Sequence, residues 1–148
     1  MSAAIQVFLR RATLPTVEGW NAALKAAGFE LVLDSFDLRS DNGYLPAFLK
    51  GEESGFEWYL SEVATAEESA DDPFKAFVGD CDLRAQLIFI SQANEEVTAA
   101  IAGAVLAKLC GGYYWDPETD RRFLQGEAAI AAARRLAAQK GLAGPEGP

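Results

Sequence analysis

The chain has 148 residues, half of them hydrophobic and 11% aromatic, and it contains no histidine. The length suits one globular domain, which we expect over residues 1–140, followed by a flexible tail over residues 141–148. The lack of histidine excludes Ser-His-Asp and Cys-His nucleophile activation in their usual forms and zinc sites that need imidazole. The formal charge of −9 argues against nucleic acid as a partner, because an acidic protein repels phosphates.

The acidic residues are concentrated in the middle of the chain. Residues 30–82 contain 14 acidic and 3 basic side chains, whereas the rest of the chain contains 8 acidic and 10 basic ones. Such a field attracts a basic protein partner, although solubility alone also accounts for an acidic surface. We expect no signal peptide and no membrane contact, because no apolar stretch approaches the length that spans a bilayer. The sequence therefore predicts a cytoplasmic protein.

The first part of the chain predicts a strand, a helix and a second strand. The first strand covers Ala4–Leu9, and Thr13 or Thr16 can cap the helix that follows. Apolar residues recur at helical spacing from Val17 onward, so Trp20 is expected in the core. The second strand covers Phe29–Leu33.

A polar connection over residues 34–42 carries Asp34, Asp37 and Asp41. Three aspartates in one loop suggest a calcium site, but their spacing does not match an EF-hand, which also needs a closing glutamate. We therefore expect no metal here, and no cofactor elsewhere in the chain.

A hairpin is the most specific pattern in the sequence. Its strands are Tyr44–Leu49 and Phe56–Glu62, and the connection Lys50–Gly55 is longer than a two-residue turn, which predicts a looser loop. Pro46 cannot donate to a ladder, so the first strand is expected at an edge or with a bulge.

Alternation along the second strand of the hairpin separates two faces. One face carries Phe56, Trp58 and Leu60, and the other carries Glu57, Tyr59 and Ser61. Glu57 and Tyr59, beside the acidic turn Glu52-Glu53, can form a binding surface. The alternative is an ordinary solvated sheet face.

The segment after the hairpin is acidic and is expected to be an exposed loop or short helix. An Asp-x-Asp pair follows, Asp80 and Asp82, for which we expect a turn with solvated carboxylates. Leu83–Ser91 is apolar enough to predict a central strand buried on both faces. Asn94 is a candidate cap for the Ala-rich helix Glu95–Cys110, which should pack flat on the sheet.

A short aromatic strand, 113–115, and a helix over Glu127–Lys140 complete the chain. This order of elements predicts an α+β fold, with two or three helices packed on an antiparallel or mixed sheet. A ferredoxin-like arrangement with an inserted hairpin is the expected topology.

The two cysteines, Cys81 and Cys110, lack CxxC spacing. Two buried or half-buried free thiols are expected, although the sequence leaves a disulfide open. An enzyme would most simply use Cys81 as nucleophile with Glu57 or Asp80 as base. Its thiolate would need activation by a nearby cation, Lys75 or Arg84.

The motifs GYLPAF and GFEWYL are followed by GGYYWDP after the Ala-rich helix, over roughly Tyr44 to Pro117. They resemble a group of small stand-alone bacterial proteins that includes uncharacterised domains and immunity proteins of toxins delivered between bacteria. The matching residues are glycines, prolines and aromatics, so the resemblance implies a fold more than an activity, and no functional residue carries over from it.

Three functional hypotheses follow. The first is an acidic protein-binding module, most simply an immunity protein that neutralises a toxin by occluding a basic surface. The others are a small-molecule-binding or structural domain, and a cysteine- or carboxylate-dependent enzyme. For the first, the candidate contacts are the acidic and aromatic side chains of the hairpin and of the segment after it: Glu52, Glu53, Glu57, Tyr59, Glu67, Glu68, Asp71 and Asp72.

Overall fold

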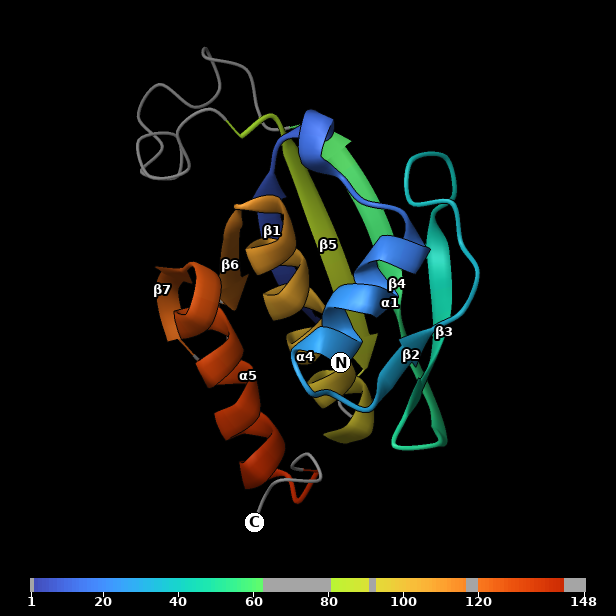
Figure 1. The fold of residues 1–148 in the computed structure, drawn as a ribbon, viewed down its shortest axis with the longest axis vertical. Helices are drawn as coiled ribbons and strands as arrows, with labels where there is room; N and C mark the ends of the chain where they lie inside the picture. The colour runs from blue at the N-terminus through green and yellow to red at the C-terminus, as the bar shows by residue number, and fades with distance from the viewer. Residues whose placement is uncertain (1, 63–80, 91–92, 117–119, 143–148) are drawn as a thin grey trace.

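The computed structural model describes residues 2–62, 81–90, 93–116 and 120–142. Within these ranges, three helices pack against one seven-stranded antiparallel sheet, which is the predicted α+β fold (Figure 1). The strands are β1 (Ser2–Leu9), β2 (Leu31–Leu33), β3 (Gly43–Leu49), β4 (Glu52–Glu62), β5 (Leu83–Ile90), β6 (Tyr113–Asp116) and β7 (Asp120–Leu124). The helices are α1 (Val17–Ala26), α4 (Ala93–Cys110) and α5 (Gly126–Gln139), and a 3-10 turn, η1, covers Arg11–Thr13.

The strand order is β2-β3-β4-β5-β1-β6-β7, and every neighbouring pair is antiparallel. The four central strands are connected as β1–α1–β4–β5–α4–β6, with the order and helix placement of a ferredoxin-like sandwich. The inserted pair is β2 with β3, because β4 belongs to the central four. β7 extends the opposite edge and was not expected from the sequence.

The three helices lie on one side of the sheet, toward the viewer in Figure 1. We call the opposite side, over which the described ranges place no helix, the outer face. Side chains along each strand point alternately toward the helices and toward the outer face, so every second side chain lies on the outer face. On β5 the residues Leu83 and Leu87 are buried under the helices, whereas Arg84 and Gln86 are half-buried on the outer face. The prediction that this strand is buried on both faces is therefore wrong.

Aromatic side chains form the centre of the core beneath α1. The ring centroids of Trp20 and Trp58 are 5.5 Å apart, and those of Trp20 and Phe56 are 6.2 Å apart. Each indole N–H donates to a backbone carbonyl, that of Trp20 to Ala102 at 3.0 Å and that of Trp58 to Leu38 at 3.1 Å. The expectation that Trp20 is a core residue is confirmed.

Helix α4 is buried on nearly all sides, between the sheet, α1 and α5. Its small side chains permit this close packing. A Cβ added at Gly103 would lie 2.7 Å from Ile5 Cγ2 of β1. The helix already begins at Ala93, so Asn94 lies in its first turn. Its side chain donates to the Glu53 carbonyl at 3.1 Å, which corrects the prediction that it caps the helix.

The β3–β4 hairpin is tighter than the sequence suggested. Leu49 pairs with Glu52, so the turn consists of Lys50 and Gly51 alone. Their φ values are 53° and 83°, and positive φ at both positions defines a type I′ turn. The prediction of a looser loop over 50–55 is wrong because Gly55 belongs to β4.

Pro46 does not mark an edge strand, because β3 lies between β2 and β4. Its carbonyl accepts from the Asp34 N–H at 2.9 Å, just beyond the end of β2. The N–H and C=O of one residue point toward the same neighbouring strand. The missing donor of Pro46 therefore faces Asp34, so the reciprocal hydrogen bond of this pair cannot form, and the pairing of β2 with β3 ends there.

Candidate functional site

A pocket of about 380 Å³ lies between the β3–β4 hairpin and the first turn of α4. Its lining combines carboxylates with aromatic side chains, and we call it the acidic–aromatic pocket. The lining residues are Asp34, Tyr44, Pro46, Ala47, Phe48, Glu53, Ser54, Asn94 and Glu95.

Large apolar side chains are exposed at and beside this pocket. Tyr44 is 53% exposed and Phe48 is 45% exposed. Val32 of β2, 57% exposed, pairs with Phe48 in the register of the sheet and extends the same patch. Exposed apolar side chains that adjoin one another are typical of interaction surfaces rather than of solvated ones.

Three carboxylates belong to the same pocket. Asp34 accepts from the Ser35 N–H at 2.8 Å, and Glu95 accepts from the Ile90 N–H at 3.4 Å. Within the described ranges, none of Asp34, Glu53 and Glu95 forms an ion pair. Their charges are therefore not neutralised locally.

Tyr44 connects the apolar and acidic parts of the pocket. Its hydroxyl donates to the Ser54 carbonyl at 2.7 Å. Partial burial raises the pKa of Tyr44, and the negative charges of Glu95 and Glu53 raise it further. The phenol thus remains a neutral donor across the physiological pH range.

The floor of the pocket is fixed by contacts between β4 and α4. The Ser54 hydroxyl lies 3.2 Å from the Asn94 carbonyl and 2.8 Å from the Thr98 hydroxyl, and both Ser54 and Thr98 are buried. Asn94 also donates to the Glu53 carbonyl, so hydrogen bonds connect the first turn of α4 to the β3–β4 hairpin. Hydrogen bonds between β4 and α4 therefore fix the floor of the pocket.

The structure brings together only part of the site expected from the sequence. Glu52 and Glu53 are exposed at the start of β4, and only Glu53 lines the pocket. Glu57 and Tyr59 are half-buried farther along the outer face of β4. The Tyr59 hydroxyl donates to Glu57 Oε1 at 2.9 Å, which raises the pKa of Tyr59. The other four expected contacts lie outside the described residues: Glu67, Glu68, Asp71 and Asp72.

Sequence reasoning missed the contributions of Tyr44, Phe48, Asp34 and Glu95. A signal was present in β3, where Tyr44, Pro46 and Phe48 alternate on one face. Assigning that face required the pairing with β4, which depends on the two-residue turn.

The aspartates of the 34–42 connection stabilise the connection itself. Asp37 Oδ1 accepts from the Arg39 N–H at 3.0 Å, and Asp41 Oδ2 accepts from the Asp37 N–H at 3.1 Å. A side-chain hydrogen bond from Ser40, together with the Arg39 N–H, lowers the pKa of Asp37. In the ranges that the structure describes, no group of three or more Cys, Asp or Glu side chains could hold a metal ion.

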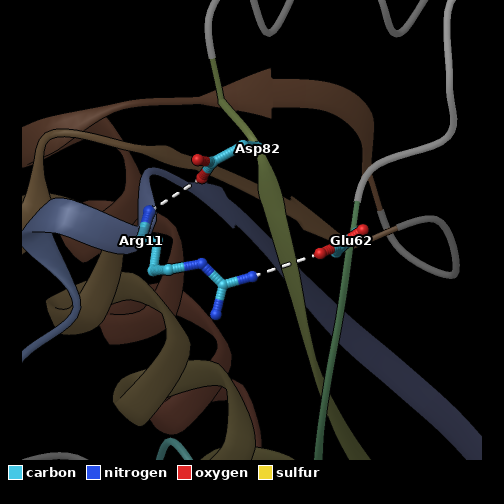
Figure 2. Close-up of polar contacts among 3 residues, drawn as sticks. All are labelled: Arg11, Glu62 and Asp82. Atoms are coloured by element: carbon cyan, nitrogen blue, oxygen red, sulfur yellow. Dashed lines mark hydrogen bonds and ion pairs between the residues drawn. The ribbon is translucent and has the colours of Figure 1, made fainter.

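Asp82, one member of the Asp-x-Asp pair, has a structural contact (Figure 2). Its Oδ1 accepts from the backbone N–H of Arg11 at 2.7 Å, at the first residue of η1. The Arg11 guanidinium pairs with Glu62 at 3.4 Å, which joins the ends of β1 and β4. The other member, Asp80, lies outside the described residues.

Both cysteines are free thiols, Cys81 half-buried and Cys110 buried, as the sequence suggested. Cys110 donates to the Leu106 carbonyl at 2.9 Å, and burial raises its pKa from 9.0 to about 11. This thiol is protonated at neutral pH and is a poor nucleophile. Of the cations considered for Cys81, Arg84 is on the outer face of β5, and Lys75 lies outside the described residues.

No helix in the described ranges is long and apolar enough to cross a membrane. Comparisons of the chain with protein-family models, with curated proteins and with solved structures find no match.

Proposed function

We propose that this protein is an acidic protein-binding module that holds a basic segment of a partner protein at the acidic–aromatic pocket. One observation carries the proposal. Three carboxylates without ion-pair partners in the described ranges surround a patch of exposed aromatic and aliphatic side chains. A lysine or arginine side chain complements both features, because its cationic head pairs with carboxylates and its stem packs on aromatic rings.

The two features have different roles in binding. Tyr44 and Phe48 supply area that loses water on contact, which is where interface energy concentrates. Glu53 and Glu95 steer a basic partner toward the pocket and accelerate association at low salt. Glu57 and Tyr59, on the same face of β4, extend the contact along the strand.

The resemblance to immunity proteins suggests the class of partner. A bacterial toxin with a basic surface would be neutralised if that surface were occluded by the hairpin. This binding would take place in the cytoplasm, and it requires no catalytic residue and no cofactor.

The test is affinity capture of basic proteins from the host lysate with matched variants of the chain. We expect one basic protein to be retained in stoichiometric amount by the unmodified protein and lost from the double variant Glu53→Lys with Glu57→Lys. Glu18→Lys, an exposed reversal on α1, is the control and should retain it. Phe48→Ala should weaken retention without changing the charge. Equal retention by all four proteins would refute binding at the hairpin.

A further inference from the structure

The acidic–aromatic pocket lies across three strands, with carboxylates on both sides of β3. The Asp34 N–H donates to the Pro46 carbonyl at 2.9 Å, so Asp34 lies beside β3 at the end of β2. Pro46 is opposite Gly55 of β4. Because neighbouring strands are about 4.8 Å apart, the backbone of Asp34 is about 10 Å from β4, across the width of the pocket.

Glu53 and Glu95 lie on the other side of the pocket. Glu53 belongs to β4, and Glu95 of α4 accepts from the Ile90 N–H at the end of β5. Burial raises the pKa of Tyr44, and the charges of Glu95 and Glu53 raise it further, so both carboxylates lie near its hydroxyl. The negative charge of the pocket is therefore divided between two ends, with Asp34 at one end and the pair of glutamates at the other.

The surface between the two ends is apolar. Pro46 and Phe48 lie on the same face of β3 and line the pocket. The phenol of Tyr44 lies against the backbone of Gly55, where an added Cβ would clash with it. In the part of the chain that the structure describes, none of the pocket residues is basic, and none of the three carboxylates forms an ion pair. A ligand that matches the pocket therefore needs a positive charge at each end and an aliphatic chain between them.

We propose that the acidic–aromatic pocket binds a linear aliphatic polyamine, with one terminal ammonium group of the ligand at each end. One ammonium would pair with Asp34, and the other would pair with Glu53 and Glu95. The methylene chain would pack over Pro46 and against the Tyr44 ring, which also attracts an ammonium group within the chain. The pocket volume of about 380 Å³ is within the range of small-molecule sites. The inference rests on the same pocket as the proposed function, and a bound polyamine would compete with the basic segment of the partner.

Isothermal titration calorimetry with cations of different length tests the two-ended site. Spermidine, which has an ammonium group at each end of a long chain, is the main probe. Butylamine has a single ammonium group, and magnesium chloride supplies two positive charges without an aliphatic chain. All titrations are made at equal ionic strength, so that general screening is the same in each. We expect saturable binding of spermidine at one site per chain, and weaker binding of butylamine and of magnesium.

Matched variants test the contribution of each end. Asp34→Asn and Glu95→Gln remove one charge each and retain an amide oxygen that can accept the same backbone hydrogen bond. Each should weaken spermidine binding about threefold or more. The loss should be larger for Glu95→Gln, because Glu95 is half-buried and Asp34 is exposed. Either variant should also reduce the preference for spermidine over butylamine. Glu18→Gln, a matched change at an exposed position on α1, should leave the affinity unchanged.

Three results would overturn the polyamine site. These are spermidine binding no tighter than that of magnesium, butylamine binding as tight as that of spermidine, and an equal loss of affinity in Glu18→Gln and the two pocket variants. The capture of a basic protein from the lysate is a separate measurement. A captured partner without spermidine binding would therefore refute the polyamine site alone, and spermidine binding without a captured partner would refute the proposed function alone.

Discussion

The side chain of Asn21 forms two hydrogen bonds with the backbone of Leu33. Its Nδ2 donates to the Leu33 carbonyl at 3.0 Å, and its Oδ1 accepts from the Leu33 N–H at 2.8 Å. Leu33 lies on β2, the edge strand of the sheet. The amide thus takes the place of a neighbouring strand and blocks edge pairing with another chain.

Replacing Asn21 with alanine should destabilise the fold. The Leu33 N–H and C=O would lose their partner, which costs about 1 to 3 kcal/mol when the groups are shielded from water. Urea unfolding of Asn21→Ala, with the exposed Lys25→Ala as control, measures this loss. A free energy of unfolding equal to that of the control would contradict the role of the amide.

Gly55 should tolerate no side chain. It has a φ of 147°, and an added Cβ would lie 2.4 Å from Tyr44 Oη and 2.7 Å from the Leu45 carbonyl oxygen. The backbone oxygen cannot move without disturbing the hairpin, so Gly55→Ala should cost about 2 kcal/mol or more. Gly51→Ala is the control, because Gly51 also has positive φ but nothing within 4 Å of the added atom. Equal stability losses from thermal unfolding would show that the clash with Tyr44 and Leu45 does not matter.

Ser54 and Thr98 should be energetically coupled. Their hydroxyls are 2.8 Å apart in the buried contact between β4 and α4. Ser54→Ala leaves the Thr98 hydroxyl without this partner, at a cost of about 1 to 3 kcal/mol. Thr98→Val leaves Ser54 with its bond to the Asn94 carbonyl alone, and the double variant removes both groups. Chemical denaturation should show that the double variant loses less stability than the sum of the single ones. Additive losses would mean that the two hydroxyls do not interact.

The two thiols should react at different rates. Cys81 is half-buried, whereas Cys110 is buried and its pKa is raised from 9.0 to about 11. Because the pKa of Cys110 is higher in the folded state, its protonated thiol stabilises the fold below pH 9. This stabilisation is lost as the pH rises through about 11. At pH 8, mass spectrometry after alkylation should find label on Cys81 first. Label on Cys110 should appear only after unfolding, so early labelling of Cys110 would contradict its burial.

Much of the fold was predictable because local signals agreed with the tertiary structure. Thr16 caps α1 as expected, with its hydroxyl accepting from the Gly19 N–H at 3.1 Å. The small side chains of α4 predicted its central position. The errors have physical causes. Lys50 adopts a positive φ that its residue type does not signal, and Asn94 bonds to another element instead of its own helix.

The candidate site was less predictable than the fold. Charge drew attention to Glu53, which lines the pocket. The pocket also depends on Asp34 and Glu95, which approach the hairpin only through pairing of β2 with β3 and packing of α4. Whether the four acidic residues over 67–72 contribute to binding stays a prediction.

The central claim is that the acidic–aromatic pocket binds a basic partner through its exposed aromatic side chains and through carboxylates that have no ion-pair partner among the described residues. The most direct measurement is the dissociation constant of the captured partner, determined calorimetrically over a range of salt concentrations. For the unmodified protein we expect affinity to fall steeply with salt. For Glu53→Lys with Glu57→Lys we expect affinity at least about tenfold weaker at low salt and a flatter salt dependence. Unchanged affinity and salt dependence in that variant would contradict the claim.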